Sequence, residues 1–254
     1  MLVSIQKENR GTEMIKDFIS IDLETTGLLP KEDRIIEIAA VKYRNGVETE
    51  VFHSYIDPER VLPERITELT GITPQMLEGQ PKFSEISQDL REFLGEDILM
   101  AHHISFDYAF LKRGFVSLSQ EKSIHFERKG IDTLKIARQC LPELESRQLS
   151  SLCEYYHIPI CAHRALEDAR ATAQVYFAMA DAFNSSKEKV FDAYQLVYKI
   201  KKESPATKLQ KERLYRLLDL HKIEPEYSVE GLTKNEASRY LDRILSEYGR
   251  SDFS

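Results

Sequence analysis

Two acidic residues of the sequence, Asp22 and Glu24, stand two positions apart where a short apolar segment runs into a turn-rich one. Side chains two apart on a strand lie on the same face, so both carboxylates can reach one spot. Two carboxylates held together repel each other, and one takes up a proton unless a cation neutralises the pair. Hard oxygen ligands of this kind favour Mg²⁺ or Mn²⁺. Alone, the pair is a weak indication of a metal site, because most such pairs are solvated strand ends.

Two further segments contain side chains of the same chemical kind. In MAHHISFDYAFL, residues 100–111, an apolar strand leads into two histidines, and Asp107 stands at the head of the next expected helix. In HRALEDA, residues 163–169, His163 precedes Asp168 by five positions. Five residues of a regular helix turn through about 500°, so these two side chains converge only if His163 lies on the entry to the helix. Taken singly, Asp107 is interpreted as a helix cap and His163 as a surface residue.

The elements that would position these residues follow from the hydrophobic pattern. Alternating apolar residues bounded by turns predict strands at 17–22, 35–43, 50–56 and 98–101, with Asn45-Gly46 as a tight turn. Helical patterns begin after Pro63, where Ser84 is expected to cap a helix, and recur at 106–115, 133–141, 148–156 and 164–183. Strands first, and then strands alternating with helices, predict an α/β or α+β domain around one mixed sheet.

Taken together, the three motifs resemble those of the DEDDh branch of the DnaQ-like exonucleases, a group that includes the proofreading epsilon subunit of bacterial DNA polymerase III. ISIDLETTGL (19–28), AHHISFDYAFL (101–111) and HRALEDA (163–169) match the first, second and third family motifs in order and spacing. Three intervening segments are also similar, namely ITELTGIT (66–73), IDTLKIAR (131–138) and RQLSSLCEYYHI (147–158). The resemblance covers about residues 17–183.

The resemblance implies a fold, a cofactor and a reaction. The fold is a ribonuclease H-like mixed five-stranded sheet flanked by helices. The implied metal ligands are Asp22, Glu24, Asp107 and Asp168, and His163 is the implied general base. Four carboxylates carry four negative charges, which two divalent ions, Mg²⁺ or Mn²⁺, would balance. The implied activity is 3′→5′ hydrolysis of DNA, with single-stranded 3′ ends as the expected substrate and nucleoside 5′-monophosphates as products.

Substrate contacts are also carried over from the resemblance. Thr25 and Thr26 are expected to seat the 3′-terminal nucleotide, and Leu28 is expected to pack on its base. The second family motif usually reads His-Asn, whereas here His103 occupies the Asn position. Because that Asn is expected to position substrate rather than metal, His103 changes the expected nucleotide contact and leaves the metal site intact.

Composition and charge suggest how the chain is divided. The expected parts are an N-terminal extension at 1–16, an exonuclease domain at 17–185 and a helical extension at 186–254. Residues 1–185 carry 21 Lys and Arg against 30 Asp and Glu, whereas residues 186–254 carry 14 against 12. An acidic body with a locally basic extension suits transient contact with nucleic acid, so the extension is interpreted as a nucleic-acid or partner-binding module.

Within this extension, three helical features are expected. A charged helix is predicted at 187–202, and Ser204-Pro205 has the pattern of a helix start. Thr233 and Glu236 form the pattern of a capping box. A small helical module over 205–250 follows from these signals.

Alternative functions remain open from the sequence. A ribonuclease T or oligoribonuclease-like enzyme that degrades RNA has the same catalytic set, and an inactive binding module would lack part of it. The spacing of Cys153, His157, Cys161 and His163 allows a zinc site, but Cys153 lies in an apolar helical stripe where cysteine is more often a core residue. A proofreading role would require a DNA polymerase in trans.

The bulk properties of the 254 residues fit these expectations. The apolar runs are too short to cross a bilayer, no export signal is visible at the N-terminus, and three cysteines do not suggest a disulfide framework. We therefore expect a cytoplasmic protein with no membrane partner. The net charge of −7 would not by itself suggest nucleic acid as a partner.

Overall fold

The computed structural model describes residues 14–118, 126–159, 164–199, 204–225 and 227–249. The chain divides into two compact units, Met1–Tyr198 and Lys199–Ser254, and each is described by itself. Within the described residues, every helix is too short or too polar to cross a bilayer.

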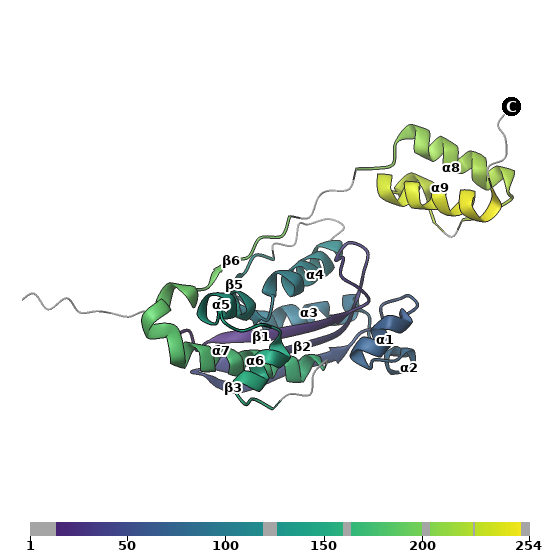
Figure 1. Cartoon of the computed structure of the whole chain (residues 1–254). Helices are drawn as coiled ribbons and strands as arrows, with labels where there is room; N and C mark the ends of the chain where they lie inside the picture. Colours follow the sequence, from purple (N-terminus) through teal and green to yellow (C-terminus); the bar gives the residue numbers. More distant parts are fainter. Residues whose placement is uncertain (1–13, 119–125, 160–163, 200–203, 226, 250–254) are drawn as a thin grey trace, which may run out of the picture. The chain divides into compact units, whose positions relative to one another are not determined.

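A mixed sheet of six strands forms the centre of the first unit, in the order β3-β2-β1-β4-β5-β6 (Figure 1). The strands are β1 (Phe18–Thr25), β2 (Ile35–Arg44), β3 (Val47–Tyr55), β4 (Leu99–Ala101), β5 (Lys129–Asp132) and β6 (Tyr194–Gln195). The first three form an antiparallel meander, and β4 then pairs with β1 in parallel. β5 continues the parallel part, and β6 closes the edge in the antiparallel direction. The predicted mixed sheet is confirmed, with one strand more than the five expected.

Helices cover both faces of this sheet. They are α1 (Glu64–Thr70), α2 (Pro74–Leu77), α3 (Phe83–Leu94), α4 (Ile104–Ser117), α5 (Thr133–Cys140), α6 (Leu149–Tyr155) and α7 (Ala165–Lys187). Phe18 of β1 packs in one core with α5, α6 and α7, whereas its neighbour Ile19 packs in a second core with α3 and α4. This alternation follows from the period of two along a strand, and it assigns every other residue of β1 to the α7 face.

Two predictions about helices in this unit are wrong, and the division of the chain also lies elsewhere than expected. Residues 187–202 do not form a helix in the part that is described, which contains a short 3-10 helix, η1 (Glu188–Val190), and then β6. Phe191 and Leu196 are buried there, 2% and 4% exposed. They are buried because this segment packs against the rest of the first unit, to which it belongs, and because β6 pairs with β5. The structural division therefore falls after Tyr198 and not after residue 185. At the start of α3, Ser84 lies inside the helix, and the Glu85 carboxylate accepts a hydrogen bond from the backbone N–H of Lys82 at 2.6 Å.

The second unit contains α8 (Lys208–Leu220), a short 3-10 helix η2 (Val229–Gly231) and α9 (Lys234–Tyr248). The predicted start at Ser204-Pro205 is wrong, because Thr207 caps α8 and Pro205 forms an isolated β-bridge with Thr233. The predicted cap at Thr233 is confirmed: its hydroxyl accepts from the N–H of Glu236, whose carboxylate accepts from the N–H of Thr233. Leu214, Leu217, Ala237, Leu241 and Ile244 are among the residues of its own small core.

Small side chains let α7 lie close to the sheet. Ala165, Ala169 and Ala173 are each 0% exposed within the core that α7 shares with the sheet. Because a close-packed interior has no spare volume, larger side chains at these positions would move the helix away from the strands.

We predict that Ala173→Leu lowers the free energy of unfolding by about 1–3 kcal/mol, the usual cost of overpacking a core. Ala182→Leu, on an exposed position of the same helix, is the matched control and should change stability by less than about 0.5 kcal/mol. Urea unfolding of both variants measures the difference. Equal stability of the two variants would mean that α7 does not need small residues against the sheet.

Candidate metal centre

Three carboxylates from two separate segments meet at the end of β1. Asp22 and Glu24 lie on the α7 face of β1, and Asp168 lies in the first turn of α7. One oxygen atom from each of the three lies within 4.8 Å of the others. The Ser20 hydroxyl donates a hydrogen bond of 2.7 Å to the Ala169 carbonyl, which fixes the start of α7 against β1. The sequence therefore brings together the first and third motifs as predicted.

A fourth carboxylate, Asp107, reaches the same place from α4. Asp107 is 4% exposed, and the backbone of Leu23 hydrogen-bonds to it. Its charge is the largest electrostatic contribution that raises the pKa of Asp22, after burial itself. The residue that precedes α4 is His103, so Asp107 lies inside the helix and its interpretation as a cap is wrong.

The carboxyl groups resist ionisation as long as no cation is bound. Burial and the charges of Asp107 and Asp168 raise the pKa of Asp22 well above its usual range. Burial, followed by the charge of Glu37, raises the pKa of Glu24 from 4.5 to about 7. Burial also raises the pKa of Asp107. A site that must hold several negative charges out of water fits a divalent cation with hard oxygen ligands.

Glu37 belongs to this cluster and was missed by the sequence analysis. It pairs with Glu24 across β1 and β2, and it is 1% exposed. One of its oxygens lies 2.7 Å from Nε2 of His53, and the other is buried with no hydrogen-bond partner among the described residues. The available signal was the acid itself, which interrupts the apolar strand IIEIAAV at 35–41. An acidic residue in a buried strand requires a charged or protonated partner.

The segment around His102 and His103 forms one wall beside the cluster. The ring of His102 lies 2.9 Å from the Thr133 hydroxyl and 2.8 Å from the Arg147 carbonyl, so both of its nitrogens are engaged. His103 has a left-handed backbone with φ of 83°, and its N–H donates to Asp132 at 3.3 Å. The side chain of His103 is exposed, and it lines a cavity of about 720 Å³ that Asp168 also lines.

The expected nucleotide-seating residues lie on the loop after β1. The Thr25 hydroxyl donates to the Gly27 carbonyl at 2.6 Å, and the Thr26 hydroxyl donates to Asp33 at 3.2 Å. Both hydroxyls therefore stabilise the loop itself. Leu28, in contrast, is 78% exposed and available for contact. Gly27 is required in this loop, because a Cβ atom there would lie 2.5 Å from the Asp33 carboxylate.

The expected base, His163, lies outside the described residues. Its neighbour Arg164 donates a hydrogen bond of 2.9 Å to the Tyr55 hydroxyl. Cys161 of the zinc alternative is also outside the described residues, while Cys153 is 0% exposed within the core. In the part of the chain that the structure describes, Asp22, Glu24 and Asp168 are the only group of three potential metal ligands within reach of one another.

We predict that the metal-free protein loses stability as pH rises from about 5 to 8. The folded chain binds protons at Glu24 more tightly than the unfolded chain, because its pKa rises from 4.5 to about 7. In this window the folded state therefore holds more protons, and the free energy of unfolding falls with pH. Thermal unfolding in EDTA at several pH values measures the effect, and Mg²⁺ should restore more stability at pH 8 than at pH 5.5.

Glu24→Gln is the control for this prediction, since it removes the titrating group and one repelling charge. Its melting temperature in EDTA should depend less on pH than that of the wild type. Parallel curves for the two proteins would show that the carboxylate cluster does not determine the pH dependence.

Comparisons with known proteins agree with this geometry. The profile of the Exonuclease family (RNase T) matches residues 19–176. The DNA polymerase III PolC-type of Oceanobacillus iheyensis is 39% identical over 163 residues, which are 64% of this chain and 11% of that protein. The DNA polymerase III PolC-type of Thermotoga maritima is 35% identical over 241 residues, which are 90% of this chain and 17% of that protein. The chain thus spans a small part of the curated relatives that it matches.

Solved structures show the same fold at lower identity. A structure described as exonuclease X in complex with 5′ overhanging duplex DNA has a TM-score of 0.55 and 22% identity, and the match covers 69% of this chain and 99% of that one. Cell-death related nuclease 4 has a TM-score of 0.55 and 18% identity, and the match covers 90% of this chain and 78% of that one.

Proposed function

This chain belongs to the Exonuclease family, and on that premise we propose that it hydrolyses DNA from the 3′ end and releases nucleoside 5′-monophosphates. The observation that supports this proposal best is the cluster of Asp22, Glu24 and Asp168 from β1 and α7, with the charge of Asp107 from α4 acting on Asp22. Curated relatives named as DNA polymerase III favour DNA as the substrate. A catalytically inactive binding module would have no need for four carboxylates that destabilise one another.

The proposed ligands of two Mg²⁺ or Mn²⁺ ions are Asp22, Glu24, Asp107 and Asp168. Asp22 is the proposed shared ligand, because the charges of the other three all act on it. Ions held in this way would stabilise the attacking and leaving oxygens of a displacement at phosphorus. The protein's own contribution is to hold four acids in place through β1 and the two helices that pack against it. Glu37 of β2 lies opposite Glu24 and adds a further acidic group, whose oxygen lies 2.7 Å from Nε2 of His53 on β3.

His163 is the proposed general base, which takes a proton from the attacking water. An imidazole with a pKa near 6.5 is suited to this step at neutral pH. His163 directly precedes Arg164, whose guanidinium is held by the Tyr55 hydroxyl of β3.

The proposed seat of the 3′-terminal nucleotide is the loop that begins at Thr25, together with the start of α4. Thr25 and Thr26 would act by fixing the loop, since their hydroxyls are already bonded within it. Leu28 would contact the base, and His103 would contact the nucleotide from the other side, because both side chains are exposed.

The wider role is proposed from the relatives and from the second unit. A proofreading or repair-like role on DNA 3′ ends, with a DNA polymerase as partner and a cytoplasmic location, fits relatives that are DNA polymerases. The second unit, with its basic helix α8, is proposed to bind nucleic acid or such a partner. Degradation of RNA is the second possibility, because the family profile includes ribonuclease T in its name.

We predict that Asp168→Asn abolishes release of nucleotides from the 3′ end, since one of four metal ligands is lost. Digestion of single-stranded DNA labelled at the 5′ or the 3′ end, with Mg²⁺ or Mn²⁺, measures this. Asp181→Asn, an exposed position on the same helix, removes the same charge and should leave the rate unchanged. Wild-type release from the 5′ end would contradict the proposed direction.

We predict that His163→Ala lowers the turnover number by about 10²–10⁴-fold, the usual contribution of a general base. Binding of Mn²⁺, followed by calorimetry, should remain within a few-fold of the wild type. Added imidazole should restore part of the rate, because it can accept the proton that the missing side chain would take. Turnover equal to that of the wild type would remove His163 from this role.

We predict faster hydrolysis of DNA than of RNA when the two oligonucleotides have the same sequence, length and labelling. The 2′-hydroxyl is the group by which a protein distinguishes the two. The ratio of kcat/KM values in one metal buffer measures the preference. A ratio in favour of RNA would support the ribonuclease-like alternative.

A further inference from the structure

A second cavity is lined by residues from the loop after β1 and from α4, which also carry or follow residues of the proposed metal centre. Its volume is about 300 Å³, and its lining comes from the loop after β1, the segment after β3, the start of α3 and the second half of α4. Phe110 and Arg113 in its wall follow the metal-site residue Asp107 by three and six positions on α4. At 1.5 Å per residue, they lie roughly 4.5 and 9 Å further along the helix axis.

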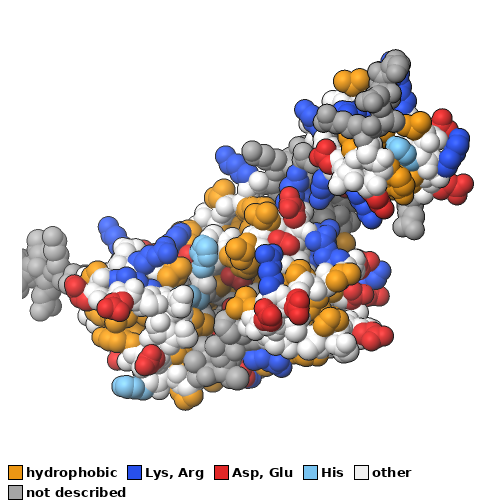
Figure 2. Space-filling view, turned by 45° about the vertical axis from the view of Figure 1, so that its right-hand side comes forward, with side chains coloured by type: hydrophobic (Ala, Val, Ile, Leu, Met, Phe, Trp, Pro, Cys, Tyr) orange, Lys and Arg blue, Asp and Glu red, His pale blue; other side chains and the backbone are white. Residues whose placement is uncertain are grey.

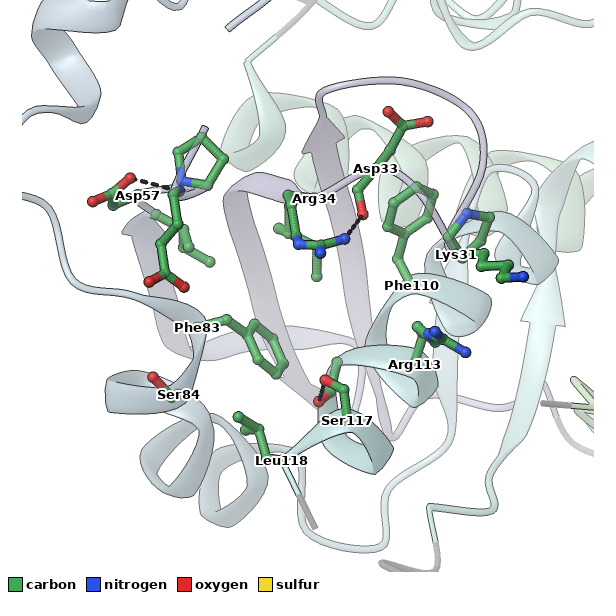
Figure 3. A pocket seen from close by; sticks show the side chains of 16 residues that line it. Lys31, Asp33, Arg34, Asp57, Phe83, Ser84, Phe110, Arg113, Ser117 and Leu118 are labelled. Carbon is green, nitrogen blue, oxygen red and sulfur yellow. Dashed lines mark hydrogen bonds between the residues drawn. The ribbon is translucent and has the colours of Figure 1, made fainter. Parts of the chain in front are cut away.

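The cavity combines an apolar floor with cationic side chains. Figure 3 shows Arg34, Phe83, Phe110 and Arg113 around the same space. Phe110 is 3% exposed and packs on Phe106 at a centroid distance of 4.9 Å, so this wall is rigid. This pocket is small, and it places a few charged side chains over an apolar floor. Such a pocket suits a single charged group, for example one phosphate, that belongs to a larger ligand.

Arg34 of this cavity, and Arg60, which lies next to it outside the lining, are bonded to neutral groups. Arg34 donates to the carbonyl oxygens of Asp33 and Glu32 at 3.1 and 3.4 Å, and Arg60 donates to the same Glu32 carbonyl at 2.6 Å. Neither guanidinium has a carboxylate within ion-pair distance among the described residues. A carbonyl oxygen orients a guanidinium but leaves its positive charge uncompensated, and the remaining N–H groups stay available to an anion.

The carboxylates at this cavity already have partners inside the protein. Asp33 accepts from the N–H of Leu29 at 2.9 Å and from the Thr26 hydroxyl. Glu59 forms an ion pair of 2.6 Å with Lys82. Burial lowers the pKa of Arg34 most, and the charges of Arg60 and Arg113 lower it further. The charges of Glu59 and Asp33 raise the pKa of Arg34, but each by less than either arginine lowers it. Arg60 and Arg113 therefore lie close enough to Arg34 to act on its charge, although the whole chain carries a net charge of −7.

Figure 2 shows basic and acidic side chains interspersed, without one continuous basic area on the face in view. A polyanionic strand would consequently be held at a few discrete points. The loop from Thr26 to Arg34 connects the strand that carries Glu24 to this cavity, and α4 carries both Asp107 and the lining residues Phe110 and Arg113.

We propose that this cavity is an accessory anion site, at which Arg34 and Arg60 bind a backbone phosphate of the nucleic-acid substrate other than the phosphate that is hydrolysed. This proposal rests on the proposed function for the identity of the ligand. The rest of the site is Arg113, which adds positive charge, and the wall of Phe83 and Phe110, which excludes water from one side.

The test compares the double variant Arg34→Gln and Arg60→Gln with a control that has the same net charge, Arg91→Gln and Lys129→Gln. All four positions are exposed, and the control residues lie outside this cavity. The first measurement is binding of fluorescein-labelled dT12 in EDTA at 50 mM salt, which requires no hydrolysis. The double variant should bind at least about 10-fold more weakly than the control, with a salt slope reduced by about 0.7 per lost phosphate contact.

The second measurement is hydrolysis of two substrates that differ in length. The p-nitrophenyl ester of thymidine 5′-monophosphate offers only the phosphate that is cleaved, whereas dT12 offers further phosphates. The double variant should lose about 10-fold in kcat/KM on dT12 and nothing on the ester. Equal binding by variant and control, or an equal loss on both substrates, would overturn the proposal.

A third arm separates a strand phosphate from a free anion. Inorganic phosphate and thymidine 5′-monophosphate are titrated against wild type and double variant by calorimetry in EDTA. In one outcome, the double variant binds these two small anions more weakly than the wild type while it binds dT12 equally well. That result would contradict a site for the phosphates of a nucleic-acid strand. Absence of hydrolysis by the wild type on either substrate would instead refute the proposed function, and the binding measurement would still decide the anion site.

Discussion

The rest of the structure depends on one electrostatic constraint, which is that several carboxylates must stay close together and largely out of water. Asp22, Glu24 and Asp168 present oxygens within 4.8 Å of one another, and Asp107 acts on Asp22 from α4. Without a cation, this arrangement costs free energy, as the raised pKa values of Asp22, Glu24 and Asp107 indicate. The remainder of the fold has to supply the stability that holds the acids in place.

That stability comes from elements that converge on the end of β1. Because side chains alternate along β1, one set of them packs in a core with α3 and α4. The other set packs in a second core with α5, α6 and α7. Buried alanines bring α7 close to the sheet, and the hydrogen bond from Ser20 to Ala169 fixes its first turn beside the carboxylates. The same loop and helix that border the carboxylates also border the arginine cavity. The proposed metal site and the proposed anion site therefore depend on the same elements of the fold.

The sequence was sufficient to predict that Asp22, Glu24 and Asp168 come together, because each lies in an extended motif with strong strand or helix patterns around it, whereas their role as metal ligands with Asp107 stays a prediction. It was insufficient for β5 and β6, which have four and two residues and depend on pairing with distant strands. The segment after α7 was wrongly expected to be helical, since local charge gave no sign that Phe191 and Leu196 would be buried. Glu37 and the Arg34 cavity were missed for a related reason: their neighbours come from other parts of the chain. Expected contacts of Thr25, Thr26, Leu28, His103 and His163 with substrate remain predictions.

Direct titration with Mn²⁺ at pH 7, by calorimetry with detection of released protons, tests the central claim. The account predicts that the wild type binds two ions per chain and releases protons, because the carboxyl groups must ionise when they become ligands. In Asp22→Asn this binding should be lost or reduced to a single weak ion. Binding in Asp22→Asn with the stoichiometry and affinity of the wild type would contradict the claim that these side chains form one metal site.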